Sequence, residues 1–194
     1  MRPLTFGAQQ RHDMASIDTL VCPDDCTSNL AEFSFSDCNP TYVAAQINYI
    51  YLTNVGYPMV DWTNPAEWGA RLALTTEANA MRRLRVIGSL PLPTSTTKDV
   101  PGGIVQGPKT YVVTADIYDI SDANWDAARA LGCNGNYLMY FSVLGEKMFY
   151  PGVAVSVNMQ PNITNSKDDY VLLTGTFTWT TKFMPLMIAD PLAA

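Results

Sequence analysis

The stretch YVLLTGTFTWTTKF, residues 170–183, decides the fold class of this chain. Its bulky apolar residues Val171, Leu173, Phe177 and Trp179 lie at alternate positions, with Gly175 at the middle position of the same series, and most residues between them are threonines. Side chains in a β-strand alternate between the two faces of the sheet, so this period of two puts the apolar groups on one face. The pattern predicts a long antiparallel strand that is buried on one side and solvated on the other.

Similar segments occur along most of the chain. The clearest is residues 111–118, where Tyr111, Val113, Ala115 and Ile117 share one face. Further strands are expected at residues 46–53, 82–90, 137–144, 147–150 and 153–159, with turns rich in Gly, Pro or Asn between several of them.

Two short helices interrupt the strands. The first follows Thr63 or Asn64, either of which can cap it, begins at Pro65 and ends near Leu74. The second spans residues 123–131, is capped by Ser121 or Asp122, and is expected to stop at Gly132. Each helix carries a tryptophan, Trp68 or Trp125, within a similar short string. Either an ancient duplication or a common way of plugging a sheet would explain the similarity, and we favour the second.

These elements predict a mainly β fold: an antiparallel β-sandwich or barrel with two short α-helices. Residues 1–32 show neither the helical nor the strand periodicity over more than a few positions, and we interpret them as an extended N-terminal arm. Residues 33–194 then form a single β-rich domain. Within it, residues 93–108 are rich in Thr, Ser, Pro and Gly, and we expect a long loop that reaches a neighbouring molecule.

Composition favours a protein that assembles. Hydrophobic residues make up 47% of the chain and charged residues only 15%, against about 25% charged residues in an average soluble domain. A chain with few charges is expected to cover part of its surface with other chains, although a polar surface rich in Thr, Ser and Asn would give the same count.

The charge distribution argues against a nucleic-acid partner. The net charge is −6 and there is no basic stripe, so we expect no sequence-specific nucleic-acid binding. The nearest candidate, residues 82–85, is interpreted as a charged strand or helix end. No apolar run approaches the roughly 20 residues that span a bilayer, and the start of the chain lacks a signal-peptide pattern, so no membrane partner is expected.

The residues that carry most enzyme chemistry are scarce or scattered. His12 is the only histidine and has no serine or cysteine placed to form an evident triad. Asp119, Asp122 and Asp126 gather at a helix start, where the helix dipole favours negative charge, but they lack the spacing of a calcium loop. We therefore expect no catalytic residues and no cofactor, and we do not expect an enzyme.

Cysteine spacing does not indicate a metal site. Cys22, Cys26 and Cys38 could supply three thiolates and His12 a fourth ligand, but their spacing matches no standard zinc template. Free thiols are expected for all four cysteines, which include Cys133, and buried free thiols are the favoured interpretation of Cys22, Cys26 and Cys38.

An aromatic cluster leaves several functions open. Tyr49, Tyr51, Tyr57, Trp62 and Trp68 lie close together in the sequence. Such rings can stack on sugars, which would indicate a carbohydrate-binding or adhesion module. They can equally anchor a core or a contact between subunits.

Several strings resemble those of one class of viral proteins. They are Cys38-Asn39-Pro40, INYIYLT at 47–53, Asp61-Trp62-Thr63, Glu67-Trp68, the segment 110–120 and TGTFTW at 174–179. Over residues 38–184 the chain is similar to virion structural proteins of tailed phages that infect Bacteroidetes, the crAss-like group among them.

The resemblance implies a tail-tube-like fold and a ring-forming subunit of the tail or neck. Its expected partners are copies of itself and neighbouring portal, tail or capsid subunits. Its expected location is the phage particle, assembled in the host cytoplasm. A capsid-decorating or head-fibre protein would have a similar composition. The family offers no catalytic residues to transfer.

Overall fold

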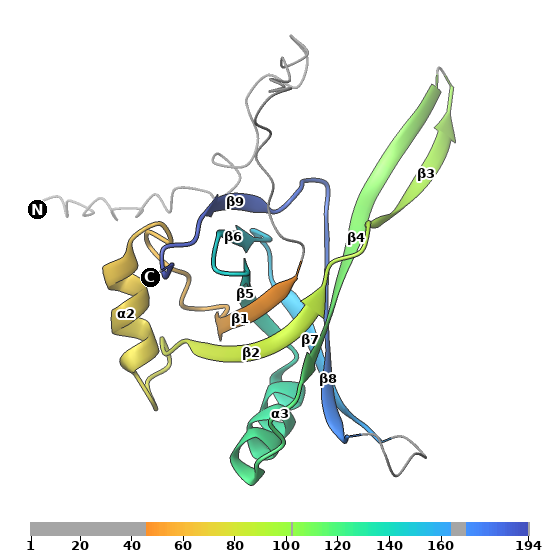
Figure 1. Cartoon of the computed structure of the whole chain (residues 1–194). Helices are drawn as coiled ribbons and strands as arrows, with labels where there is room; N and C mark the ends of the chain where they lie inside the picture. The colour runs from red at the N-terminus through yellow and green to blue at the C-terminus, as the bar shows by residue number, and fades with distance from the viewer. Residues whose placement is uncertain (1–45, 102, 164–169, 194) are drawn as a thin grey trace, which may run out of the picture. The chain divides into compact units, whose positions relative to one another are not determined.

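The computed structural model describes residues 46–101, 103–163 and 170–193, and its described part is mainly β with antiparallel strands and two helices (Figure 1). The predicted fold class is confirmed. The expected arm at 1–32, and the boundary that separates it from the domain, lie outside the described residues. The elements are β1 (Ile47–Asn54), α2 (Pro65–Ala73), β2 (Arg82–Ser89), β3 (Thr94–Val100), β4 (Gly103–Ile117), α3 (Asp122–Asn134), β5 (Asn136–Val143), β6 (Lys147–Tyr150), β7 (Val155–Asn162), β8 (Leu172–Thr181) and β9 (Leu186–Ala189).

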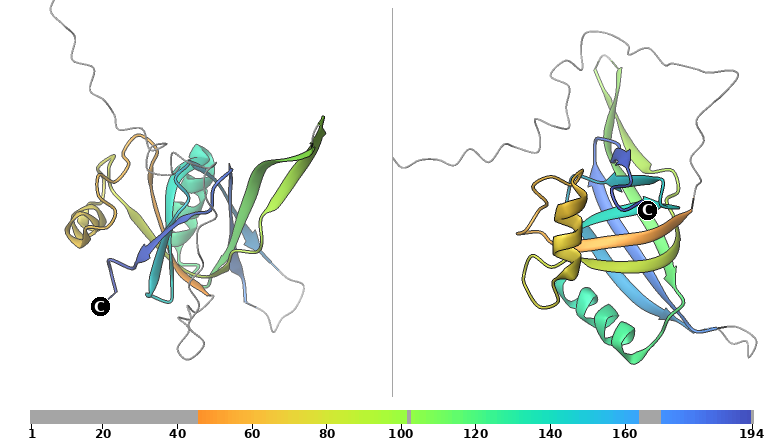
Figure 2. Two further views of the ribbon diagram at one scale, coloured as in Figure 1. Left: turned by 90° about the horizontal axis from the view of Figure 1, so that it is seen from above. Right: turned by 60° about the vertical axis from the view of Figure 1, so that its left-hand side comes forward.

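Strand pairing closes the sheet into a barrel. The order is β1-β2-β4-β8-β7-β5, and β5 also pairs with β1 from Tyr137 to Val143. On one edge of β5, β7 pairs only with the first two residues of the strand. The last three residues of β5 pair with β6, and β6 pairs in turn with β9. Two views from other directions show the strands curving around a common interior (Figure 2).

The barrel interior is filled by the residues that the period of two places on the inner face. In the register of β4 and β8, Tyr111 lies opposite Trp179 and Val113 opposite Phe177. All four are buried, and the rings of Tyr111 and Trp179 stack with centroids 5.2 Å apart. The alternation of buried apolar residues with outward-facing residues, predicted for residues 170–183, is therefore confirmed by β8.

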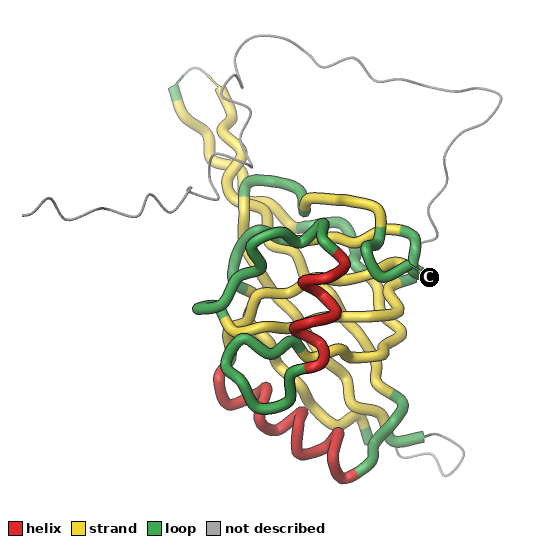
Figure 3. The backbone as a smooth tube through the Cα atoms, turned by 90° about the vertical axis from the view of Figure 1, so that its left-hand side faces the viewer, coloured by secondary structure: helices red, strands yellow, loops and turns green. Residues whose placement is uncertain are grey.

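A second apolar layer lies outside the barrel, beneath α2, which crosses the strands in Figure 3. We call it the α2 layer; its buried members are Tyr51, Trp68, Met81, Tyr140, Met148 and Tyr150. Because β1 and β5 contribute to both the barrel interior and this layer, they are buried on both faces. The helix is capped as predicted: Asn64 Oδ1 accepts a hydrogen bond from the Ala66 amide at 3.0 Å, and Pro65 occupies the first turn.

The second helix differs from its prediction in three respects. Ser121 occupies the N-cap position, but its side chain makes no capping hydrogen bond in the described structure. The helix continues through Gly132 to Asn134, and the chain leaves it at Gly135, whose φ of 71° is a left-handed conformation that favours glycine. Gly132 was therefore the wrong stop. Trp125 is also 36% exposed, whereas Trp68 is fully buried, so only the first helix plugs the sheet with its tryptophan.

The expected loop at 93–108 is wrong: those residues form most of a β-hairpin. Residues Thr94–Val100 pair with the first part of β4, from Val100 opposite Gly103 to Thr94 opposite Thr110. Every residue of β3 whose side chain is described is exposed, so neither face selects apolar residues at alternate positions and the segment shows no hydrophobic period. No helix of the described part is long and apolar enough to cross a membrane.

Candidate functional site

The β3–β4 hairpin projects from the barrel (Figure 1). Every residue of β3 whose side chain is described is exposed, and Leu92, just before it, is 94% exposed. Only the later part of β4, from Lys109 onward, pairs with β8 and joins the barrel. The ribbon is therefore two-stranded and uncovered, a form that is at best marginally stable on its own in water.

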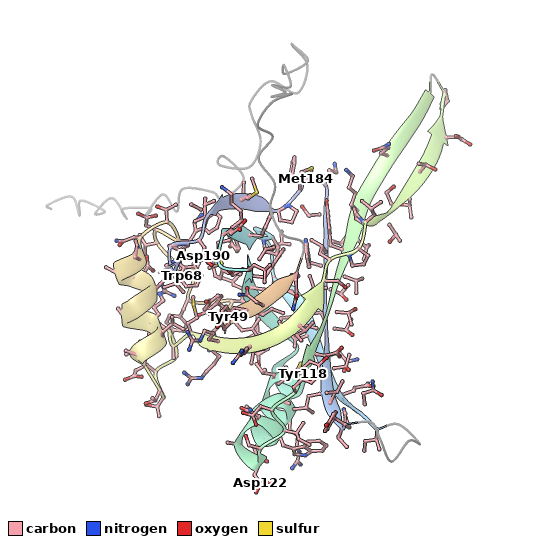
Figure 4. The ribbon with its side chains drawn as sticks, viewed as in Figure 1. Tyr49, Trp68, Tyr118, Asp122, Met184 and Asp190 are labelled. Carbon is pink, nitrogen blue, oxygen red and sulfur yellow. The ribbon has the colours of Figure 1, made fainter. Side chains whose placement is uncertain are left out.

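A second feature is a groove of about 850 Å³ between β2 and α3, which we call the β2–α3 groove. Its apolar lining includes Leu84 and Val86 of β2, Ile117 of β4, and Ala128 and Leu131 of α3. Tyr49 of β1 and Tyr118, which follows β4, also line it and are labelled in Figure 4.

The charged groups of this groove are mainly basic. Arg83, Arg85 and Asp119 line it, which gives two positive charges against one negative. The guanidinium of Arg83 lies over the ring of Tyr49, with its central carbon 5.4 Å from the centroid. Both arginines are exposed. The sequence interpretation of residues 82–85 as a charged strand end was correct for the strand but gave no indication of the groove.

One edge of β2 is unpaired beside the groove. Residues 82–85 pair with β1, but the register with β4 covers only Ile87, Gly88 and Ser89. Among the described residues, 82–86 therefore have no strand on their second side. Asn48, at the irregularity of β1, also lines the groove, and its buried Oδ1 has no hydrogen-bond partner in the described part of the chain.

The aromatic residues singled out in the sequence serve mainly as a core. Trp68 and Tyr51 are 0% and 2% exposed and meet edge to face at 5.1 Å. Trp68 Nε1 donates to the Trp62 carbonyl at 2.8 Å. Burial raises the pKa of Tyr51 to about 12 and also raises the pKa of Tyr140. Tyr57 is 46% exposed and lies outside this layer. Because Tyr51 and Trp68 are buried, the five aromatic rings do not form one exposed surface.

A buried carboxylate has a structural environment. Asp190, labelled in Figure 4, accepts a hydrogen bond from Ser142 Oγ of β5 and another from the Leu192 amide at 2.8 Å. Its own amide donates to the Glu146 carbonyl at 3.1 Å. These bonds fix the chain after β9 against β5. Within the described structure the Asp190 carboxylate is buried and engaged in hydrogen bonds, so it has no exposed side at which a substrate could bind.

The metal and nucleophile candidates are not brought together where the structure describes them. Cys133 is an exposed free cysteine, while Cys22, Cys26, Cys38 and His12 lie outside the described residues. In residues 46–101, 103–163 and 170–193 there is no group of three metal-ligating side chains. At the start of α3, Asp119 Oδ1 accepts from the Ser121 amide, which is a turn contact rather than a ligand set.

Comparison with known proteins adds no relative, because neither a family model nor a curated protein matches the chain.

Proposed function

We propose that this chain is a structural virion protein of a tailed bacteriophage that self-assembles into a ring in the tail or neck. The observation that carries the proposal is the uncovered β3–β4 hairpin. Its exposed backbone edge and faces favour a covering partner, since an isolated two-stranded ribbon is marginal in water.

The contact that the hairpin would make is heterologous. One copy would present the hairpin and the next a different surface, and head-to-tail contacts of this kind close into rings when the rotation between copies permits. Pairing of an exposed strand edge with a neighbour supplies main-chain hydrogen bonds without requiring many charged side chains. The low charged fraction of 15% is consistent with such an assembly.

The outer face of the barrel also suits a structural role. Thr174, Thr176 and Thr178 of β8 point away from the interior and are half-buried, and Ser156 and Asn158 of β7 lie opposite Thr178 and Thr176. This face is polar and nearly neutral, which would let a channel wall avoid binding DNA phosphates. The viral identity itself derives from the sequence resemblance, and portal, tail or capsid subunits are the proposed neighbours.

Replacement of the hairpin tests the proposal. Residues 95–109 are replaced by Asn-Gly, a pair that favours the two-residue turn of a hairpin and would join Thr94 directly to Thr110. We expect the full chain to form a closed oligomer by light scattering and the variant to be a monomer with an unchanged near-ultraviolet circular dichroism spectrum. A folded variant that assembles like the parent would overturn the role of the hairpin.

A further inference from the structure

We propose that the β2–α3 groove receives residues 17–25 of a second copy of this chain, added as a strand to the unpaired edge of β2. The inference rests on the ring assembly proposed above and identifies one of its contacts. Residues 17–25 lie outside the described part of the chain, and their amino-acid sequence indicates their fit to the groove.

The groove has the backbone geometry of a strand acceptor. Residues 82–86 have no strand on their second side among the described residues, so their outward amide and carbonyl groups have no ladder partner there. An extended peptide added to such an edge gains main-chain hydrogen bonds, and the pockets beside it select its side chains. The buried, unpartnered Oδ1 of Asn48 adds an acceptor inside the same groove.

The side chains of the groove indicate what kind of peptide it takes. Its floor and walls are apolar at Leu84, Val86, Ile117 and Leu131, so they would bury alternate apolar side chains of an added strand. Arg83 and Arg85 make its charge positive overall. The preferred occupant is therefore an extended segment that is both apolar and acidic.

Residues 17–25, IDTLVCPDD, have this chemistry. Ile17, Thr19 and Val21 are β-branched and would share one face of a strand. Asp18, Asp24 and Asp25 give the segment three negative charges and no positive charge. Residues 17–21 also match in length the unpaired residues 82–86, and Pro23 would end the pairing because it has no amide hydrogen.

Charge and chain length favour this segment over other parts of the molecule. Residues 1–45 carry six acidic and two basic side chains, so they hold −4 of the net charge of −6. Residues 26–45 connect the segment to β1, and at about 3.3 Å per residue they would span up to about 66 Å, enough to reach an adjacent subunit.

Photo-cross-linking between isotopically distinct copies tests the inference. Benzoylphenylalanine replaces Ala127, an exposed residue of α3 that lines the groove, in the full-length chain. Heavy-isotope-labelled and unlabelled chains are mixed, irradiated and digested, and mass spectrometry identifies the linked peptides. The matched control carries the same photoreactive residue at Asn158, which is exposed on β7 and does not line the groove.

We expect cross-links from position 127 to the peptide that contains residues 17–25, in pairs of mixed isotope, and none to that peptide from position 158. Cross-links to this peptide within a single isotope form only would mean that each chain fills its own groove, which overturns the proposal. Cross-links from position 127 to other segments, or none, would overturn it as well.

A charge reversal supplies a second readout. R85E should lower the mixed-isotope cross-link by about fivefold, because an attractive pair becomes a repulsive one. R129E makes the same change on the exposed surface of α3 outside the groove and should leave the yield unchanged. Equal yields in the two variants would refute the charge complementarity.

Light scattering on the same samples separates this inference from the proposed function. A closed oligomer that lacks the cross-link to residues 17–25 would refute the arm contact and leave the ring proposal standing. A monomer at every concentration would refute the ring proposal and, with it, the contact between copies.

Discussion

Replacing Trp68 with alanine tests how α2 is held against the barrel. The side chain is 0% exposed and meets the rings of Tyr51 and Tyr140 edge to face, at 5.1 and 5.2 Å. Its indole nitrogen donates to the Trp62 carbonyl at 2.8 Å, which ties the residues before α2 to the helix. The substitution therefore removes the largest side chain of the α2 layer together with a hydrogen bond.

The expected loss of stability is large. Truncation of a buried tryptophan to alanine costs about 3–5 kcal/mol, because the lost apolar burial and the remaining cavity add. We expect a value of about 4 kcal/mol for W68A, since aromatic rings surround the site on several sides. W68F keeps most of the burial but leaves the Trp62 carbonyl without its donor, so about 2 kcal/mol is expected.

Urea unfolding followed by far-ultraviolet circular dichroism gives both values, and the second helix provides the matched control. W125A makes the same chemical change at a residue that is 36% exposed, and it should cost about 1 kcal/mol or less. If W68A were no more destabilising than W125A, the burial and ring contacts assigned to Trp68 would be wrong.

Three further changes test other parts of the fold. G175A should destabilise the chain by about 1–3 kcal/mol, because its Cβ would lie 2.9 Å from a ring carbon of the buried Phe177 as well as 2.7 Å from the sulfur of Met159. The control G69A meets nothing within 4 Å on α2 and should stabilise by about 0.5–1 kcal/mol; equal effects in urea unfolding would contradict this packing. N64A should cost about 1 kcal/mol through loss of the cap of α2, measured in the same way, and a neutral result would contradict the cap. Burial raises the pKa of Tyr51 to about 12 and that of Tyr140 as well, so the folded state favours the neutral phenols. Their stabilisation should be complete below about pH 10 and lost as the pH rises through the folded pKa values. Absorbance titration of the phenolates, compared with the chain in urea, checks this; equal midpoints would refute it.

Regular strands could be predicted because one face of each is buried. The period of two in residues 170–183 and 111–118 reflects a barrel interior that accepts every second side chain. Both segments form strands, although β4 begins at Gly103, before its predicted start. The first helix could also be predicted from the sequence, since Asn64 and Pro65 are local signals of a helix start.

The β3–β4 hairpin could not be predicted from a hydrophobic period. Both faces of β3 are exposed, so nothing selects apolar residues at alternate positions, and the Thr, Pro and Gly content resembles a loop. Gly132 was a plausible helix stop, but the backbone turns left-handed only at Gly135, three residues later. A glycine shows where such a turn is allowed and not where it occurs.

The candidate groove depends on contacts between distant parts of the chain. Arg83 and Arg85 belong to β2, whereas Ala128 and Leu131 belong to α3, and no local pattern indicates that they face one space. The unpaired edge arises because β4 leaves β2 after pairing with three residues, which is a property of topology. Sequence identified these residues as a strand and a helix, and only the arrangement of the two produced a site.

We propose that this chain assembles through heterologous contacts into a closed ring, and negative-stain electron microscopy of the purified full-length chain, over a range of concentrations, distinguishes a ring from a single chain. Ring-shaped particles with one fixed number of subunits are expected, and the Asn-Gly replacement of residues 95–109 should abolish them. Particles the size of a single chain at every concentration would refute the ring.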